Sequence, residues 1–202
     1  MHISEGVLSG PVLTAGAVIA AAGTGIGLKK LEHEKIVQAA ILASAFFVAS
    51  LIHVNIGPAS AHLILNGIVG ILLGFAAFPA ILTALILQAV LFQYGGITAL
   101  GVNVIIMAVP AVVAHYALRS LTGRSEKMTF LAGFLAGFFS IALSGILLSG
   151  ALWLTNAGFL KTCVAILGAN VPVMLIEGVI TAFCLSFLMK VYPEMLSASS
   201  RA

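Results

Sequence analysis

The chain has 202 residues, of which 61% are hydrophobic and only 7% are charged, and its formal net charge is +3. Apolar runs longer than 18 residues recur along it, which excludes a soluble globular protein and indicates helices that cross a membrane. The basic residues are dispersed among short loops and not gathered on one face, so nucleic-acid binding is not indicated.

Hydropathy and turn residues together predict an all-α integral membrane protein, a bundle of about seven transmembrane helices. The predicted spans, in chain order, are residues 6–28, 36–56, 62–75, 79–94, 99–118, 128–154 and 162–190. Ser60 is placed to cap the third helix, which begins near His62, and Pro79 falls in the first turn of the fourth. The third span is short for a full crossing, and Asn170-Val171-Pro172 is expected to interrupt the seventh. Residues 1–202 are expected to form a single transmembrane domain.

The basic residues predict how this bundle is oriented. Seven spans place the two termini on opposite sides of the membrane. An outer amino terminus leaves only Lys161 outside, which agrees with the positive-inside rule. The cytoplasmic basic residues are then Lys29, Lys30, Lys35, Arg119, Arg124, Lys127, Lys190 and Arg201. The amino terminus lacks the basic region of a signal peptide, and the bulky His2 disfavours removal of the initiator, so Met1 is expected to be the mature terminus.

Polar residues gather in the outer half of the predicted bundle. They are His2, His53, Asn55, Ser60, His62, Asn66, Gln88, Gln93, Thr98 and Asn103. Buried polar side chains are costly unless they are paired, so their convergence at one depth indicates a binding site.

The amino terminus offers a chelating set of nitrogens. The amine of Met1, the amide nitrogen of His2 and the His2 imidazole form adjoining five- and six-membered rings around one ion, and His62 supplies a fourth nitrogen. Four nitrogens in a plane favour Ni(II) or Cu(II) over tetrahedral zinc, and soft sulfur ligands suited to Cu(I) are lacking.

Three stretches carry a family resemblance: the opening MHISEG, residues 57–74 with SAHL at 60–63, and residues 88–107 with FQYGGITALGVN at 92–103. Together they resemble the nickel/cobalt substrate-binding (S) subunit of energy-coupling-factor transporters, the NikM/CbiM family, strongly over residues 1–118 and beyond that only in hydropathy. The resemblance implies that Met1, His2 and His62 bind the transported ion, Ni(II) or Co(II), at the outer face of a prokaryotic inner membrane. It further implies a transmembrane coupling (T) protein and two cytoplasmic ATPases as partners; whether a small accessory membrane subunit joins them is left open.

Further residues are candidates for holding the ligating imidazoles in place: His53, Asn55, Ser60, Asn66, Gln88, Gln93 and Asn103. Glu177 is an acid inside the last span, where ionisable groups are usually functional, and it is expected to hold a proton, pair with a hydroxyl or lie in a cavity. His33 and His115 are expected to be solvated or interfacial on the cytoplasmic side.

Several alternatives to a nickel-binding transport subunit remain. A phosphate-binding loop is lacking, so ATP hydrolysis is assigned to the partners and the chain is not expected to be an enzyme. The other interpretations are a cobalt-specific subunit that feeds cobalamin synthesis, a stand-alone metal channel, and an intramembrane protease with Ser144 as nucleophile and His115 as base.

Overall fold

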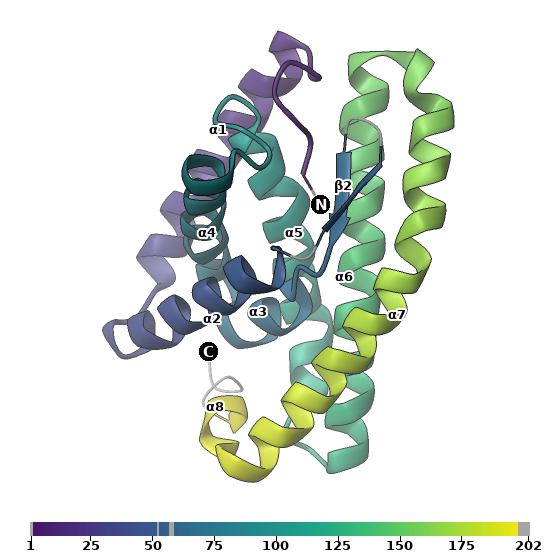
Figure 1. Ribbon diagram of the computed structural model, residues 1–202. Coiled ribbons are helices and arrows are strands. Elements are labelled where there is room, and N and C mark those ends of the chain that lie inside the picture. The colour runs from purple at the N-terminus through teal and green to yellow at the C-terminus, as the bar shows by residue number, and fades with distance from the viewer. Residues whose placement is uncertain (1, 52, 57–58, 198–202) are drawn as a thin grey trace.

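The computed structural model describes residues 2–51, 53–56 and 59–197, with the side chains of 53–56, 59–61 and 197 left out of the description. The helices of this part of the chain are α1 Gly10–Lys30, α2 Ile36–Ala49, α3 Asn66–Leu73, α4 Ala77–Phe92, α5 Leu100–Leu118, α6 Glu126–Thr155, α7 Leu160–Val191 and α8 Pro193–Ser197. Short 3-10 turns join them at His33–Lys35, Gly74–Ala76, Arg119–Leu121 and Ala157–Phe159. The first seven correspond in order to the predicted helices, and the all-α bundle is confirmed (Figure 1).

Five helical segments of the described chain are long and apolar enough to cross a membrane. They are Gly10–Lys30, Asn66–Phe92, Leu100–Leu121, Glu126–Thr155 and Ala157–Val191. Large apolar side chains such as Val18, Ile146 and Phe183 are exposed on their outer faces. Because helices satisfy their own backbone hydrogen bonds, such faces are stable against lipid. The chain is therefore a multi-pass membrane protein.

A β-hairpin replaces the predicted junction between the second and third helices. Strands β1 His53–Ile56 and β2 Ala59–His62 pair antiparallel, with His53 opposite His62. The prediction that the second helix continues to residue 56 and that Ser60 caps a helix starting near His62 is wrong. The two strands satisfy each other's backbone groups, so this polar segment needs no helix to remain within the bundle.

The α6 and α7 helices form a long antiparallel pair (Figure 1). A Cβ on Gly133 would lie 2.7 Å from Cα of Ala182, so glycine is needed for this close approach. The predicted interruption of the last helix at Asn170-Val171-Pro172 is also wrong, because α7 continues through Pro172. Packing against α6 stabilises α7 on both sides of the proline.

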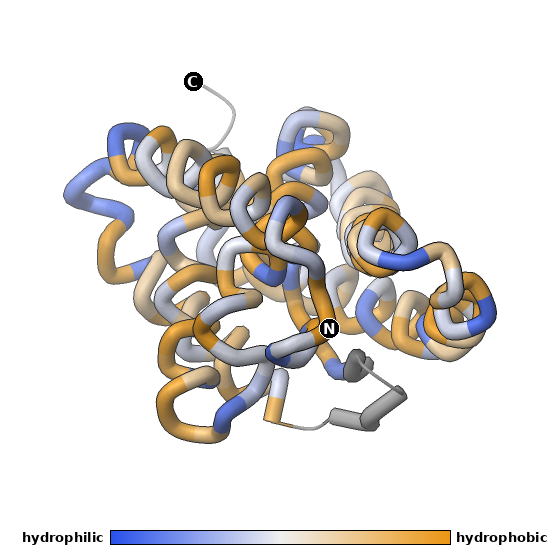
Figure 2. The backbone as a smooth tube through the Cα atoms, turned by 90° about the horizontal axis from the view of Figure 1, so that it is seen from above, coloured by the Kyte–Doolittle hydropathy of each residue, from blue (hydrophilic) through white to orange (hydrophobic). Residues whose placement is uncertain are grey.

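The start of the chain reaches into the bundle with His2 and Ile3, whereas residues 4–6 are exposed. Viewed from above, the first described residues of the chain lie among the helices (Figure 2). The side chain of Ile3 is completely buried and belongs to the same apolar core as Phe46, Ile81 and Met107. Residues 2–9, which precede α1, are thus anchored to the core through Ile3 and Leu8.

Candidate metal centre

The two predicted histidine ligands, His2 and His62, lie together in the interior. Their exposed fractions are 4% and 2%. The ring centroids are 4.5 Å apart with the planes inclined by 28°, and the ring of Tyr94 is centred 6.4 Å from that of His2. Two segments far apart in sequence thus bring their imidazoles to one buried place. Met1 lies outside the described residues.

The imidazole of His62 is oriented by the backbone. Its Nδ1 lies 2.7 Å from the carbonyl oxygen of Leu63. A carbonyl oxygen only accepts hydrogen bonds, so Nδ1 carries the proton and Nε2 carries the lone pair. A backbone carbonyl on one ring nitrogen is a common way to orient a metal-binding histidine through the other nitrogen.

Asn103 holds the amino-terminal segment by its backbone. The Ile3 amide donates to Oδ1 of Asn103 at 2.9 Å, and Nδ2 of Asn103 donates to the Ile3 carbonyl at 3.1 Å. Both groups are buried, where an unpaired backbone amide or carbonyl is costly. This pair of bonds therefore fixes the residue directly after His2.

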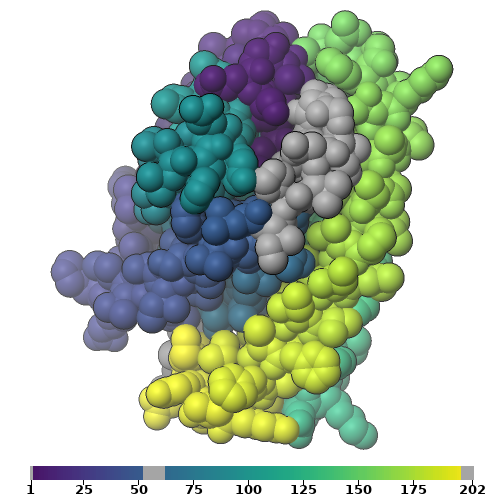
Figure 3. All heavy atoms as spheres, in the orientation of Figure 1, coloured from purple at the N-terminus to yellow at the C-terminus, as the bar shows by residue number. Residues whose placement is uncertain are grey.

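A glycine turn between α4 and α5 makes room for the same segment. Gly95 and Gly96 have φ of +75° and +87°, a region that favours glycine. A Cβ on Gly95 would lie 2.8 Å from Nδ2 of Asn103, and one on Gly96 would overlap the side chain of Glu5. Figure 3 shows the purple amino-terminal residues beside the teal connection between α4 and α5. Only residues without a side chain allow this contact.

Glu5 ties the outer end of the segment to the turn. Its Oε1 accepts a hydrogen bond from the Thr98 amide at 3.0 Å. This backbone bond stabilises the carboxylate and lowers the pKa of Glu5 from its usual value. Gln93, in a left-handed conformation with φ of +57°, is exposed and lines a cavity of about 270 Å³ with Ser4 and Glu5.

Asn66 and Gln88, two of the other predicted supporting residues, connect helices. Asn66 is buried and donates from Nδ2 to the Met107 carbonyl at 3.3 Å and to Oγ of Ser144 at 3.1 Å, which joins α3 to α5 and α6. Gln88 donates from Nε2 to Oγ of Ser50 and joins α4 to the end of α2. Neither has a hydrogen bond to His2 or His62 among the bonds described.

The remaining predicted supporting residues are His53, Asn55 and Ser60. All three lie on the hairpin, with their backbones in strands β1 and β2. Their side chains lie outside the described part of the structure, so their role stays a prediction.

Of the two expectations for His115, solvated or interfacial, the first is wrong. This histidine is buried, with Nδ1 at 3.0 Å and 3.1 Å from the carbonyl oxygens of Gly70 and Ile71, and Nε2 at 3.0 Å from the Arg119 guanidinium. It therefore satisfies carbonyls near the end of α3. Ser144 instead accepts from Asn66, so these two residues have separate partners and the protease interpretation loses its geometric basis.

Glu177 lies against the chain segment that follows His62, a position that its residue type alone does not predict. Its carboxylate accepts hydrogen bonds from the backbone amides of Ile64 and Leu65, two and three residues after His62 in the chain. Backbone donors leave no signature in side-chain identities. Only the three-dimensional arrangement brings α7 to this segment.

The described side chains alone do not make a complete metal site. Within residues 2–51, 53–56 and 59–197, three His, Cys, Asp or Glu residues do not gather in any metal-binding group. Two imidazoles alone leave a transition ion incompletely coordinated. The amine and amide nitrogens at the start of the chain are the donors that the predicted square-planar set adds.

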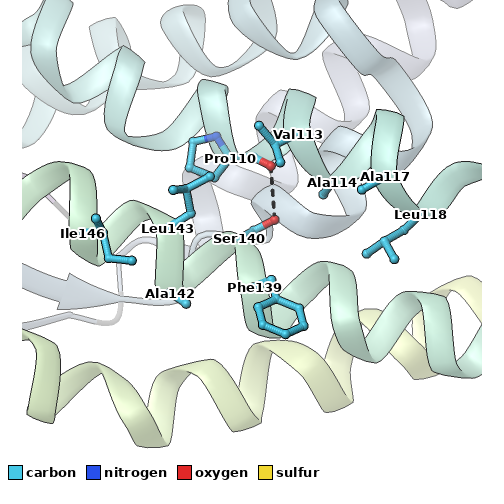
Figure 4. Close-up of a pocket in the computed structure, with 10 residues that line it drawn as sticks. All are labelled: Pro110, Val113, Ala114, Ala117, Leu118, Phe139, Ser140, Ala142, Leu143 and Ile146. Atoms are coloured by element: carbon cyan, nitrogen blue, oxygen red, sulfur yellow. Dashed lines mark hydrogen bonds between the residues drawn. The ribbon is translucent and has the colours of Figure 1, made fainter.

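A separate groove lies between α5 and α6 (Figure 4). It has a volume of about 390 Å³ and is lined by side chains such as Pro110, Phe139 and Leu143. Its polar group, Oγ of Ser140, donates to the Pro110 carbonyl at 3.4 Å. The side chains that line this apolar groove offer no nitrogen donor, so it is not part of the candidate metal centre.

Residues 2–195 match the family model CbiM, described as a cobalt uptake substrate-specific transmembrane region. A Haemophilus influenzae protein named for metal transport is 44% identical over 200 residues, which cover 98% of this chain and 97% of that protein. The fused nickel transport protein NikMN of Rhodobacter capsulatus is 39% identical over 145 residues, which cover 66% of this chain and 42% of that protein. A crystal structure of a truncated transition metal transporter superposes with a TM-score of 0.79 at 24% identity, over 95% of this chain and 99% of that one, and so shares the fold.

Proposed function

Because this chain belongs to the CbiM family of cobalt uptake substrate-specific transmembrane proteins, we propose that it is the metal-binding subunit of an energy-coupling-factor importer. Its substrate is Ni(II), with Co(II) as the alternative ion. The observation that carries this proposal is the buried pair of His2 and His62 beside an amino-terminal segment held by Asn103.

In this proposal the ion binds four nitrogens: the Met1 amine, the His2 amide nitrogen, Nδ1 of His2 and Nε2 of His62. The first three form the two chelate rings described above. The assigned proton on Nδ1 of His62 leaves Nε2 as its donor, which agrees with this set. Selectivity comes from geometry, because a planar nitrogen field suits nickel better than zinc.

The whole chain, residues 1–202, acts as a single substrate-binding domain in the inner membrane of a prokaryotic cell. The amino terminus faces outward, so the ion enters from the outside, and the carboxyl terminus faces the cytoplasm. The distribution of basic residues supports this orientation. A transmembrane coupling protein and two cytoplasmic ATPases supply the energy. The fused architecture of the Rhodobacter capsulatus relative, of which this chain covers 42%, supports assembly with further transport components.

The test is nickel binding by the purified protein with its native start, compared with a variant that carries one extra residue before Met1. The extension converts the terminal amine into an amide and removes a ligand, so the one-to-one, diamagnetic, square-planar complex should be lost. His33→Ala is the matched control, because His33 lies in an exposed turn far from the centre in sequence and should leave binding unchanged. Unchanged affinity and spectrum after extension would refute the proposed site.

The ion and the transport mode need separate measurements. Parallel titrations with Ni(II) and Co(II) identify the preferred ion, and a preference for cobalt would favour the cobalt-specific alternative. Proteoliposomes that contain only this subunit should take up no metal, whereas uptake without any ATPase would indicate a stand-alone channel.

A further inference from the structure

Glu177 is a completely buried carboxylate in α7, with an exposed fraction of 0%. The backbone amides of Ile64 and Leu65 both donate to its Oε1, Leu65 at 2.8 Å, and Leu65 also lies 3.1 Å from Oε2. A carboxylate at this depth is costly unless it is hydrogen-bonded, so these bonds account for its presence. The proposed coordination of the ion does not itself include Glu177.

One peptide unit connects Glu177 to His62. The carbonyl of Leu63 and the amide of Ile64 belong to the same planar group, and the peptide bond keeps them rigidly opposed. The amide donates to Glu177, while the carbonyl accepts from Nδ1 of His62. A carboxylate on the amide side polarises the carbonyl and strengthens its bond to the imidazole, because linked hydrogen bonds reinforce one another.

Leu65, the residue after Ile64, also needs the hydrogen bond to Glu177. Leu65 has φ of +58° and ψ of 20°, a left-handed conformation that is uncommon for residues other than glycine. It lies where β2 ends and α3 begins, so its amide has no partner within a helix. Glu177 supplies that partner and stabilises the sharp turn that follows His62.

Close packing fixes the carboxylate relative to α3. A Cβ on Gly67 of α3 would lie 2.7 Å from the backbone nitrogen of Gly137 in α6. A Cβ on Gly137 would in turn overlap the backbone carbonyl of Glu177 in α7. Three helices therefore meet at this level with backbone against backbone, and α7 also packs on β2.

We propose that Glu177 is a positioning residue for the metal site: through the Leu63–Ile64 peptide it fixes the ring orientation and tautomer of His62. This proposal rests on the proposed function, since it assigns His62 as a ligand. It also connects α7 to the ion, because a displacement of α7 moves the peptide that orients the imidazole. Motion of this helix is thus a route by which a partner weakens binding and releases the ion.

The test compares Glu177→Gln with Thr181→Val. The first keeps the shape of the side chain but replaces the carboxylate by a weaker acceptor. The second changes a buried hydroxyl one turn along α7 that has no hydrogen-bond partner among the described residues, so it serves as the matched control. Nickel affinity is measured by chelator competition, and the His62 tautomer is measured by nitrogen NMR on the metal-free protein.

Glu177→Gln should weaken nickel binding about 10- to 100-fold, as changes to groups behind a ligating histidine do. It should also convert His62 from a single Nδ1-protonated tautomer to a mixture. Thr181→Val should change neither. A merely structural role would lower thermal stability without altering the tautomer, so an unchanged tautomer or an affinity within twofold of the wild type would overturn the proposal.

If the Glu177→Gln protein does not fold, amide hydrogen exchange of the wild-type protein tests the proposal in its place. The amides of Ile64 and Leu65 should exchange with solvent as slowly as those of α7, and rapid exchange would overturn the proposal. Failure of the wild type to bind nickel would refute the proposed function instead, while the tautomer and exchange data on metal-free protein would still decide the role of Glu177.

Discussion

Replacing Asn103 by alanine should weaken metal binding without unfolding the protein. The substitution removes both hydrogen bonds to Ile3, at 2.9 Å and 3.1 Å. Two neutral hydrogen bonds contribute about 1–3 kcal/mol together. With about 1.4 kcal/mol per factor of ten, the dissociation constant for nickel should rise about 5- to 140-fold. The loss acts on affinity because the amino-terminal segment must be ordered for His2 to meet His62.

Chelator competition on the purified protein measures the affinity, and thermal unfolding of the metal-free protein measures stability. Asn156→Ala is the control, since the Asn156 side chain caps an exposed turn by accepting from the Gly158 amide at 2.8 Å. It should leave nickel affinity unchanged. An Asn103→Ala protein that binds nickel as tightly as the wild type would show that the segment is ordered by other contacts, and the reasoning would fail.

Three further predictions concern the same region. Gly96→Ala should weaken nickel binding at least several-fold, because the added Cβ overlaps Glu5 and φ at this position is +87°. Gly25→Ala, in open space on α1, is the control and should leave nickel binding unchanged. Equal nickel affinities of the two variants would contradict this prediction. The hydrogen bond from the Thr98 amide lowers the pKa of Glu5 below 4.5. The contribution of this bond to holding the amino-terminal segment on the turn is therefore complete above about pH 4.5 and is lost as the pH falls through the lowered pKa. Glu5→Gln should therefore remove the acid transition in the Thr98 amide shift, and a transition that persists would assign it to another group. Gly137→Ala should destabilise the fold by about 1–3 kcal/mol in thermal unfolding, because the added methyl overlaps the α7 backbone, and an unchanged transition would refute that packing.

Hydropathy predicted the helices well because membrane helices are recognisable in a sequence as long apolar runs. It failed at residues 53–56 and 59–62, which pair as two strands. There the chain satisfies its backbone by pairing with itself inside the protein, and this outcome depends on neighbouring helices more than on local propensity. The continuation of α7 through Pro172 has the same origin in tertiary packing.

The candidate site was likewise predictable only in part. The approach of His2 to His62 was predicted, because the chelating pattern at the start of the chain needs a further nitrogen. Asn103 was predicted to hold a ligating imidazole in place, and that role stays a prediction; the hydrogen bonds described for it go to the backbone of Ile3, the residue after His2. The partners of Glu177 were beyond prediction, since they are main-chain amides from a distant segment.

The α6 and α7 helices are longer than the membrane is thick. At 30 and 32 residues, they extend about 45 Å and 48 Å, well beyond a hydrocarbon core of about 30 Å. A pair this long must tilt or protrude, and a thicker bilayer reduces the tilt. Because Glu177 is carried on this pair and its amide partners are on a short interior segment, we expect lipid chain length to adjust the position of Glu177 relative to those amides, and through them the proposed metal site.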